Sequence, residues 1–256
     1  MNWKLISWNV NGIRAAEKKG FLEWLGVCGA DLVAVQETKA HPEQLSEGLL
    51  KPAGYEAAWN SAEKKGYSGT VTYSKHSPVK VLTGMNEPRF DTEGRVLIHE
   101  FEPIVFFNIY FPNGGRGAEW VEHKLAFYRR FLEIAHGYMQ TGRPIVVTGD
   151  FNTAYAEIDL ARPKENVAHS GFMPEERQGL GEFFEAGLID TFRYLHPDTV
   201  KYSWWDQVTR ARERNVGWRL DYFLVSADLK ERIVAAAIHE EVMGSDHCPV
   251  SLVLSL

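Results

Sequence analysis

The sequence predicts an α/β fold of two packed β-sheets flanked by helices. Roughly ten short apolar runs have the length of strands, whereas only a few longer segments repeat their apolar residues at helical spacing. The two kinds of segment do not alternate strictly along the chain, which argues against a doubly wound parallel sheet. No linker of low complexity and no shift in composition divides the chain, so residues 1–256 are expected to form one domain.

Each expected element follows from its own apolar pattern. The longest helix is expected at 118–138, where Trp120, Leu125, Tyr128, Leu132 and Ala135 trace one face. Shorter helices are expected at 20–28, 42–50 and 180–186, and the segment 152–179, which has no clear period, is expected to be a long loop. Strands are expected at 3–10, 31–35, 55–60, 69–75, 95–102, 104–111, 144–151, 218–226 and 249–254, with a weaker candidate at 233–239.

Composition excludes several classes of protein. The chain is 45% hydrophobic and 24% charged, which is typical of a globular protein rather than a disordered or fibrous one. No apolar run approaches the roughly 20 residues that span a bilayer, and the amino terminus lacks the pattern of a secretory signal. The two cysteines, Cys28 and Cys248, have no metal-ligand spacing and are expected to be buried. We therefore expect a cytoplasmic protein that does not contact a membrane.

The charge of the chain limits how it can bind a polyanion. A net charge of −6 argues against a general nucleic-acid binder, whose surface usually carries a basic excess. A local exception is the segment that contains Arg210, Arg212, Arg214 and Arg219, where only Glu213 opposes the positive charge. On charge alone, this segment is equally well interpreted as a DNA contact or as a solvated charged face.

Polar groups interrupt the apolar strands in five places. The pairs at 9 and 11 and at 150 and 152 are spaced so that both side chains point to one face of a strand. Any single cluster is uninformative, because Asn and Asp are common turn residues and a lone Asp221 is more readily a structural ion-pair partner. The informative feature is the repetition, which involves Asn9, Asn11, Glu37, Asp150, Asn152, Asp221, Asp246 and His247.

Carboxylates that gather at one place need a cation. The ends of strands in a layered sheet lie along one edge, so these clusters are expected to meet there. Carboxylates held close together repel each other unless protons or a cation neutralise them. Oxygen ligands with few histidines and no cysteine suit Mg²⁺ or Mn²⁺. The sequence thus predicts a divalent-metal site at one edge of the fold.

Several longer stretches match one known family, in the family's order and over nearly the whole chain. They include SWNVNGIRA (7–15), VQETK (35–39), NIYFPNG (108–114), GDFNTA (149–154), EIDLARPK (157–164), NVGWRLDYFLVS (215–226) and MGSDHCPV (243–250). The chain resembles the exodeoxyribonuclease III family of abasic-site (AP) endonucleases, within the wider endonuclease/exonuclease/phosphatase fold. That resemblance implies a four-layered α/β sandwich, in which two packed mixed β-sheets are flanked by helices.

The resemblance also implies an activity. It indicates a metal-dependent DNA phosphodiesterase of base excision repair, which incises 5′ to abasic sites and leaves a 3′-hydroxyl. Relatives combine this incision with 3′→5′ exonuclease and 3′-phosphodiesterase or phosphatase activity in varying balance. The implied partner is double-stranded DNA that contains abasic sites or 3′ ends, the implied cofactor is Mg²⁺, and the chain is expected to be a monomer.

Matched positions in the family imply how a metal would be held. Glu37 would be a direct ligand, and Asp150 and Asn152 would also position or deprotonate the attacking water. The sequence does not distinguish one metal ion from two. The full set of implied metal ligands is Glu37, Asn9, Asn11, Asp246, Asp150 and Asn152.

The same resemblance implies how the phosphate would be contacted. His247 would contact the scissile phosphate, and Asp221 would form a hydrogen bond to His247 and raise its pKa. Tyr110 would reach the phosphate or the leaving oxygen, and Asn113 would contact the phosphate. Either Asp150 or a neutral His247 could be the base, and we favour Asp150.

Other matched positions imply contacts with the rest of the substrate. Trp204, Trp218 and Leu220 correspond to residues that line a pocket for a sugar without its base. An abasic nucleotide lacks stacking and pairing, so it costs less to extrude than a normal one, and a tight pocket would reject a sugar with a base. Core packing is the alternative for both tryptophans. The candidates for contacts with the DNA backbone are Lys39, Tyr67, Arg95, Arg116 and Arg210.

Two other functions compete with this interpretation. A phosphatase of the same fold that acts on phospholipids or inositol phosphates would share the Asp and His residues, but the arginine segment and the tryptophan pair argue against it. A catalytically inactive DNA-binding relative should have lost at least one of the catalytic positions, and all of them are present.

Overall fold

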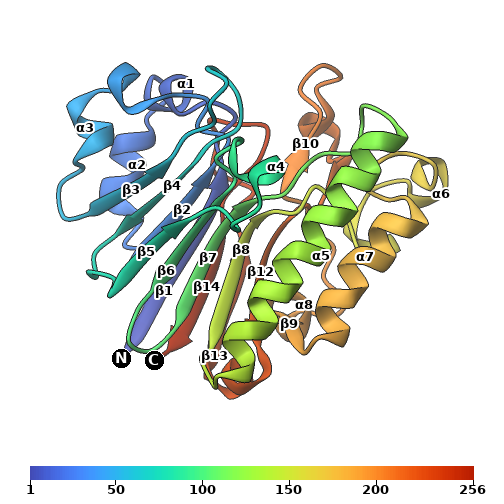
Figure 1. The fold of residues 1–256 in the computed structure, drawn as a ribbon. Helices are drawn as coiled ribbons and strands as arrows, with labels where there is room; N and C mark the ends of the chain where they lie inside the picture. Colours follow the sequence, from blue (N-terminus) through green and yellow to red (C-terminus); the bar gives the residue numbers. More distant parts are fainter.

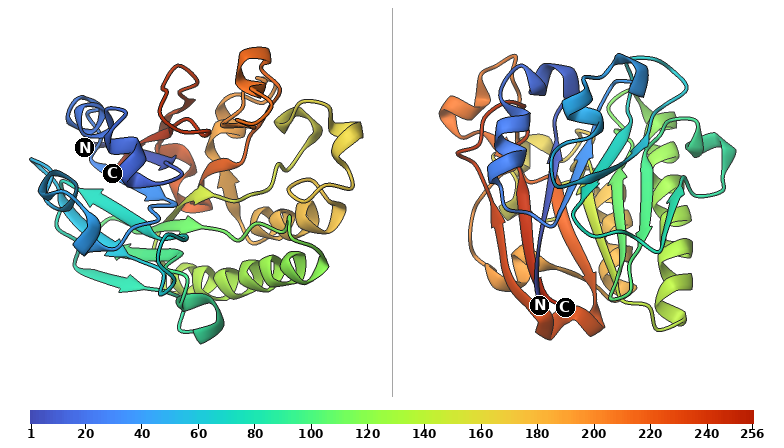
Figure 2. Two further views of the ribbon diagram at one scale, coloured as in Figure 1. Left: turned by 90° about the horizontal axis from the view of Figure 1, so that it is seen from above. Right: turned by 90° about the vertical axis from the view of Figure 1, so that its left-hand side faces the viewer.

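Two six-stranded β-sheets pack face to face, and helices cover the outer face of each (Figures 1 and 2). The computed structural model describes residues 1–256. This arrangement of four layers confirms the predicted α/β sandwich. None of the helices combines the length and the apolar character that a membrane crossing needs.

Both sheets are mixed. The first has the order β13 (Ile233–Ile238), β14 (Val250–Ser255), β1 (Asn2–Asn9), β2 (Leu32–Gln36), β4 (Thr70–Ser74) and β3 (Glu56–Asn60). The second has the order β5 (Lys80–Thr83), β6 (Val96–Glu100), β7 (Val105–Tyr110), β8 (Ile145–Asp150), β12 (Asp221–Ser226) and β9 (Leu188–Asp190). A separate two-stranded ribbon joins β10 (Trp204–Trp205) and β11 (Gly217–Trp218).

The helices differ in length and place. The outer face of the first sheet is covered by α1 (Ile13–Glu17), α2 (Phe21–Val27) and α3 (Glu47–Leu50), and that of the second by α5 (Ala118–Gln140) and α7 (Pro174–Glu185). The remaining helices, α4 (Pro88–Asp91), α6 (Pro163–Asn166) and α8 (Thr191–Leu195), are single turns. Short 3₁₀ turns occur at Pro42–Gln44, Glu157–Asp159, Ala211–Arg214 and Ala227–Arg232.

Three apolar clusters hold the four layers together. The central one lies between the sheets and includes Leu32, Phe106 and Leu252. The other two fill the spaces between each sheet and its helices, with Phe21 in one and Phe131 in the other. Burying one such side chain stabilises the fold by about 1.5–3 kcal/mol, so the clusters fix how the sheets lie against each other.

Strand pairing brings the predicted polar clusters to one edge of the molecule. Asn9 at the end of β1 lies opposite Gln36 at the end of the parallel strand β2, directly before Glu37. In the second sheet, Asp150 lies opposite Tyr110 of β7 on one side and Asp221 of β12 on the other. In Figure 1 this edge is at the top, and the two chain termini lie at the opposite edge.

The prediction of one long loop at 152–179 was wrong in part, because helical elements occur along the segment. The segment contains the 3₁₀ turn at Glu157–Asp159 and α6, and α7 begins at Pro174 rather than at 180. Proline suits the first turn of a helix because its missing N–H would be unpaired there. The expected helix at 42–50 is divided, since Leu45 is extended and the Ser46 hydroxyl caps α3 by accepting from the Leu49 N–H.

Other differences concern short elements and burial. The edge strands β5 and β9 were not predicted, and the expected strand at 218–226 is broken after Trp218, which pairs with Trp204 instead. Trp120, Leu125 and Leu132 are only half-buried; the buried face of α5 contains Val121, Lys124, Phe127, Tyr128, Phe131 and Ala135. Cys28 is half-buried rather than buried, whereas Cys248 is buried as expected.

Gly149 is required where β7 and β8 approach each other, directly before Asp150. Its φ is +143°, and a Cβ at this position would lie 1.7 Å from the carbonyl oxygen of Ile109. No side chain fits without moving one of the two strands. The glycine therefore fixes the place of Asp150 relative to the neighbouring strand.

We predict that Gly149→Ala lowers the free energy of unfolding by about 3 kcal/mol or more, because the clash involves backbone and the φ is unfavourable for alanine. The matched control is Gly137→Ala in α5, which has nothing within 4 Å of the new methyl group and should gain about 0.5–1 kcal/mol from helix propensity. Urea unfolding measures both. Equal stability of the two variants would contradict the prediction.

Candidate active site

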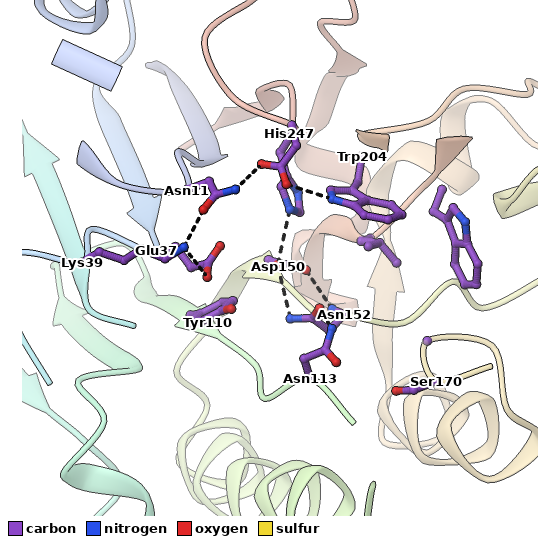
Figure 3. A pocket seen from close by; sticks show the side chains of 14 residues that line it. Asn11, Glu37, Lys39, Tyr110, Asn113, Asp150, Asn152, Ser170, Trp204 and His247 are labelled. Atoms are coloured by element: carbon purple, nitrogen blue, oxygen red, sulfur yellow. Dashed lines mark hydrogen bonds and ion pairs between the residues drawn. The ribbon is translucent and has the colours of Figure 1, made fainter. Parts of the chain in front are cut away.

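A cavity of about 350 Å³ opens at the polar edge of the two sheets (Figure 3). One wall is rich in oxygen atoms and the other is apolar. The lining residues are Asn11, Glu37, Lys39, Tyr110, Asn113, Asp150, Asn152, Ser170, Gly171, Trp204, Trp218, Leu220, Asp246 and His247.

Asp150 lies buried at the centre of the site and is held by three donors. Its Oδ1 accepts the backbone N–H of Asn152 at 2.8 Å, and its Oδ2 accepts the Asn9 amide at 2.9 Å and the Asn152 amide at 3.3 Å. Asn113 donates to Oδ1 of Asn152 at 2.8 Å. The Asp150 carboxylate and the side-chain amides of Asn9 and Asn152 are therefore fixed in orientation.

His247 bridges Asp150 and a second buried acid. Its Nδ1–H donates to Oδ2 of Asp221 at 2.8 Å, and its Nε2 lies 3.8 Å from Oδ2 of Asp150. The Ser203 hydroxyl donates to the same oxygen of Asp221 at 2.6 Å. Because Nδ1 is engaged by Asp221, Nε2 is the nitrogen that faces the cavity side of the site.

The protonation of these groups follows from burial and from their mutual charges. Burial opposes a charged imidazole, but the carboxylates of Asp221 and Asp150 outweigh it and raise the pKa of His247 to about 10. Burial also raises the pKa of Asp150 to about 7, although the His247 charge opposes the shift. The site thus pairs a charged donor with an acid whose pKa is near neutrality, which suits a general base.

Glu37, Asn11 and Asp246 line the part of the oxygen-rich wall that comes from the first sheet and the loop before β14. Asn11 donates its amide N–H to Oδ1 of Asp246 at 3.0 Å. The Lys39 ammonium lies 3.4 Å from a Glu37 oxygen and also donates to Oδ1 of Asn11. A cationic group thus already lies among these oxygens, as expected of atoms arranged to bind positive charge.

The donor set fits a divalent metal. Asp150, Asp221 and His247 each offer a ligand atom, and these atoms lie within 4.8 Å of one another. However, the short bond between Asp221 and His247 commits that pair to holding a proton. Glu37, Asp246 and Asn11 offer carboxylate and amide oxygens that contact Lys39, Asn11 and Trp204 but are not paired with a buried histidine. Carboxylate and amide oxygens are the ligands that hard cations prefer. Asn9 lies fully buried beneath the cavity, and its Oδ1 accepts the Asn11 N–H.

Arg95 is placed differently from the expectation of a DNA contact. Only 3% of its surface is exposed, and its guanidinium donates to the Tyr110 carbonyl, the Tyr67 hydroxyl and Glu93. It also lies over the Tyr110 ring, 4.6 Å from the ring centre. Arg95 therefore supports Tyr67 and Tyr110 from below rather than projecting toward a DNA strand.

The apolar wall is formed by the residues matched to the sugar pocket. The rings of Trp204 and Trp218 meet edge to face at 6.4 Å between centres, and Leu220 packs beside them. Trp204 donates its indole N–H to Oδ2 of Asp246 at 3.2 Å. Both tryptophans are half-buried and line the cavity, so the alternative of pure core packing does not hold for them, whereas Trp205 is buried in the central cluster.

Only some of the arginines in the predicted basic segment are exposed. Arg219 is fully buried and pairs with Asp159 at 2.8 Å and with Asp190 at 2.7 Å. Arg212 donates to three backbone carbonyls and lies over the Trp205 ring. Arg210 is exposed and keeps its guanidinium free for a ligand, and Arg116, also exposed, lies over the Trp120 ring.

Sequence reasoning missed Ser203, Ser170 and Gly171. The Ser203 hydroxyl donates to Asp221, and the only sequence feature that could have indicated it is its position directly before the tryptophan pair. Ser170 and Gly171 line the cavity from the segment that was predicted to be a featureless loop. Nothing in the local pattern indicated them, because both are held by the Glu176 side chain, whose buried position depends on its pairing with Lys124 of α5.

Comparison with known proteins identifies the fold. The model of the endonuclease/exonuclease/phosphatase family matches residues 6–247. The chain belongs to this family. It is 44% identical over 255 residues to an exodeoxyribonuclease of Bacillus subtilis, covering 99% of this chain and all of that protein. It is 38% identical to the DNA repair nuclease APEX1 of Danio rerio, covering all of this chain and 83% of that one.

A solved structure of this family has the same fold. The AP endonuclease LMAP of Leishmania major superposes with a TM-score of 0.91 at 32% identity, covering all of this chain and 88% of that one. The superposition covers the whole of this chain and therefore both sheets. Membership of the family therefore agrees with the resemblance found in the sequence.

We predict that Asp221→Asn narrows the pH range of activity at its alkaline end. With Nδ1 bonded to Asp221, His247 can donate from Nε2 to an anion only in its charged form. Loss of the Asp221 charge lowers the pKa of His247 from about 10, so this charge is lost at lower pH. The descending limb of the pH–rate profile should move down by about one unit or more. An unchanged alkaline limb would show that His247 does not depend on Asp221 for its charge.

Proposed function

We propose that this protein is a metal-dependent DNA repair nuclease that incises the phosphodiester 5′ to an abasic site and leaves a 3′-hydroxyl. The observation that carries the proposal is the cavity, in which a wall of carboxylate and amide oxygens faces an apolar wall of two tryptophans and a leucine. The first wall suits a phosphodiester and the second suits a sugar without its base. Residues 1–256 would act as one domain.

The metal in this proposal is Mg²⁺, with Mn²⁺ as a substitute. Glu37, Asp246 and Asn11 would hold it, with Asp150 and Asn152 beside them on the same oxygen-rich wall. Asn9 would support this wall from beneath, where its amide donates to Asp150. When bound, such a cation neutralises charge on the phosphate and stabilises the departing 3′-oxygen. The relatives that supply the comparison are nucleases by name, which supports this reading.

The chain's own residues would perform the proton transfer. Asp150 takes a proton from the attacking water, and the backbone N–H of Asn152 keeps its carboxylate in place. His247, oriented by Asp221, donates from Nε2 to a phosphate oxygen. Burial and the Glu37 carboxylate raise the pKa of Tyr110, so its hydroxyl stays protonated and can donate to the phosphate or the leaving oxygen, beside Asn113.

Substrate selection would depend on the apolar wall and on the rim of the cavity. A base attached to the sugar would have to fit against Trp204, Trp218 and Leu220, whereas an abasic sugar fits without it. Lys39, Tyr67, Arg116 and Arg210 lie at or near the rim and would contact the DNA backbone. The Bacillus relative is named an exodeoxyribonuclease. The same activity in this protein would require a 3′ end of DNA to bind in the same cavity.

The test is a side-by-side assay in Mg²⁺ on duplexes with an abasic site, a recessed 3′ end, a 3′-phosphate or a uracil, with an inositol phosphate and a phospholipid beside them. We expect incision at the abasic duplex at least tenfold faster than at the uracil duplex, and none in chelator. Turnover of the lipid or inositol phosphate alone would replace the proposal by the phosphatase alternative, and equal turnover in chelator would refute the metal dependence.

We predict that Asp150→Asn lowers kcat for abasic incision by about 10³-fold or more, because the water loses its proton acceptor. Binding of abasic duplex, measured by fluorescence anisotropy, should change by less than about threefold, since the amide preserves the shape of the side chain. A folded Asp150→Asn variant with wild-type kcat would show that another residue is the base.

A further inference from the structure

A lysine interrupts the buried face of α5. Lys124 lies in the stripe that contains Val121, Phe127 and Tyr128, and none of its surface is exposed. Its ammonium donates to Oε1 of Glu176 on α7 at 2.7 Å and to the backbone carbonyl of Asn152 at 2.7 Å. A fully buried lysine cannot contact DNA, so its function must be inside the molecule.

Glu176, the partner of Lys124, is also fully buried and binds a second part of the cavity. Its Oε1 accepts the Ser170 hydroxyl at 2.9 Å, and its Oε2 accepts the Gly171 N–H at 2.6 Å. Ser170 and Gly171 line the cavity beside Trp218. One ion pair therefore holds two segments, the turn after β8 on the lysine side and the loop before α7 on the glutamate side.

The turn after β8 needs such a restraint, whereas Gly171 in the loop before α7 adopts its positive φ without strain. Asn152 has a φ of +51°, which is unfavourable for a residue with a side chain and persists only where its surroundings hold it. Gly171 has a φ of +96°, and its carbonyl accepts the Ala154 N–H at 2.8 Å. The Lys124–Glu176 ion pair contacts both segments, because Lys124 binds the first and Glu176 binds the second.

Stability alone does not account for this arrangement. Burying an ion pair costs desolvation energy, which the attraction between the two charges roughly offsets. A protein with a well-packed apolar pair in the same place is often as stable or more stable. All the further hydrogen bonds of Lys124 and the strong ones of Glu176 go to Asn152, Ser170 and Gly171, which line the cavity. Neither residue touches the reacting atoms.

We propose that the buried Lys124–Glu176 pair is a positioning element, which fixes the distance between Asn152 beside the catalytic carboxylate and the Ser170–Gly171 wall of the sugar pocket. The inference rests on the proposed nuclease function. Small displacements are costly here, because a shift of about 1 Å between the reacting groups can lower a rate about 100-fold.

The test is the double variant Lys124→Met/Glu176→Gln, which leaves no unpaired buried charge and retains an oxygen that can accept the Gly171 N–H. We expect kcat for abasic incision to fall tenfold or more while KM changes by less than threefold, in protein with a wild-type circular dichroism spectrum. The control is Tyr138→Phe, which removes a hydrogen bond from the far end of α5 to Glu100 and should leave kcat unchanged.

The outcomes separate the inference from the function on which it rests. A wild-type protein that does not incise abasic duplex refutes the proposed function. An active wild type and a folded double variant with kcat within twofold of it overturn the positioning role, even if the variant melts at a lower temperature. If the double variant does not fold, Glu176→Gln, which has the same shape, is judged by the same split between kcat and KM.

Discussion

The active site depends on polar contacts that join the two sheets at one edge. Asn9 at the end of β1 donates to Asp150 at the end of β8, and one layer below, Gln36 of β2 donates to Asn108 of β7 at 2.8 Å. Farther from this edge, the space between the sheets is filled by the apolar central cluster. Apolar packing tolerates small slips between sheets, whereas buried amides lose bonds when they move. The amide contacts therefore set the relative position of the sheets where the chemistry requires it.

Strained backbone gathers at the same edge. Four of the nine non-glycine residues with positive φ line the cavity, namely Asn11, Glu37, Lys39 and Asn152. Such conformations cost on the order of 1 kcal/mol or more each and require support from their surroundings. That support is visible, because the Glu37 carbonyl accepts the Gly12 N–H at 2.8 Å and the Lys39 N–H donates to the Ser68 carbonyl at 2.8 Å. The backbone that carries the proposed ligands is thus held in place by the fold itself.

The sequence predicted the layers and the polar strand ends because both depend on local patterns. Apolar runs that stop at Asn9, Glu37 and Asp150 indicate a shared edge whatever the details of packing. Burial of charge could not be predicted in this way. Arg219 is buried against Asp159, 60 residues away in sequence, and Lys124 against Glu176, 52 residues away. The sequence around a charged residue does not show whether its side chain contacts solvent or a distant partner. The arginine segment therefore had two interpretations, and no local pattern predicted the burial of Lys124 on α5.

This use of charge inside the fold affects how the protein can attract DNA. Arg219, Arg95 and Lys124 are buried and engaged by partners within the fold, and the net charge is −6. The overall field therefore opposes a polyanion, and attraction must be local. It can come from the exposed Arg116 and Arg210, from Lys39, and from a cation bound among the carboxylates, where its charge reverses that of the wall. Affinity for the phosphate and competence for its hydrolysis would then depend on the same bound ion, which ties DNA binding to the place where cleavage occurs.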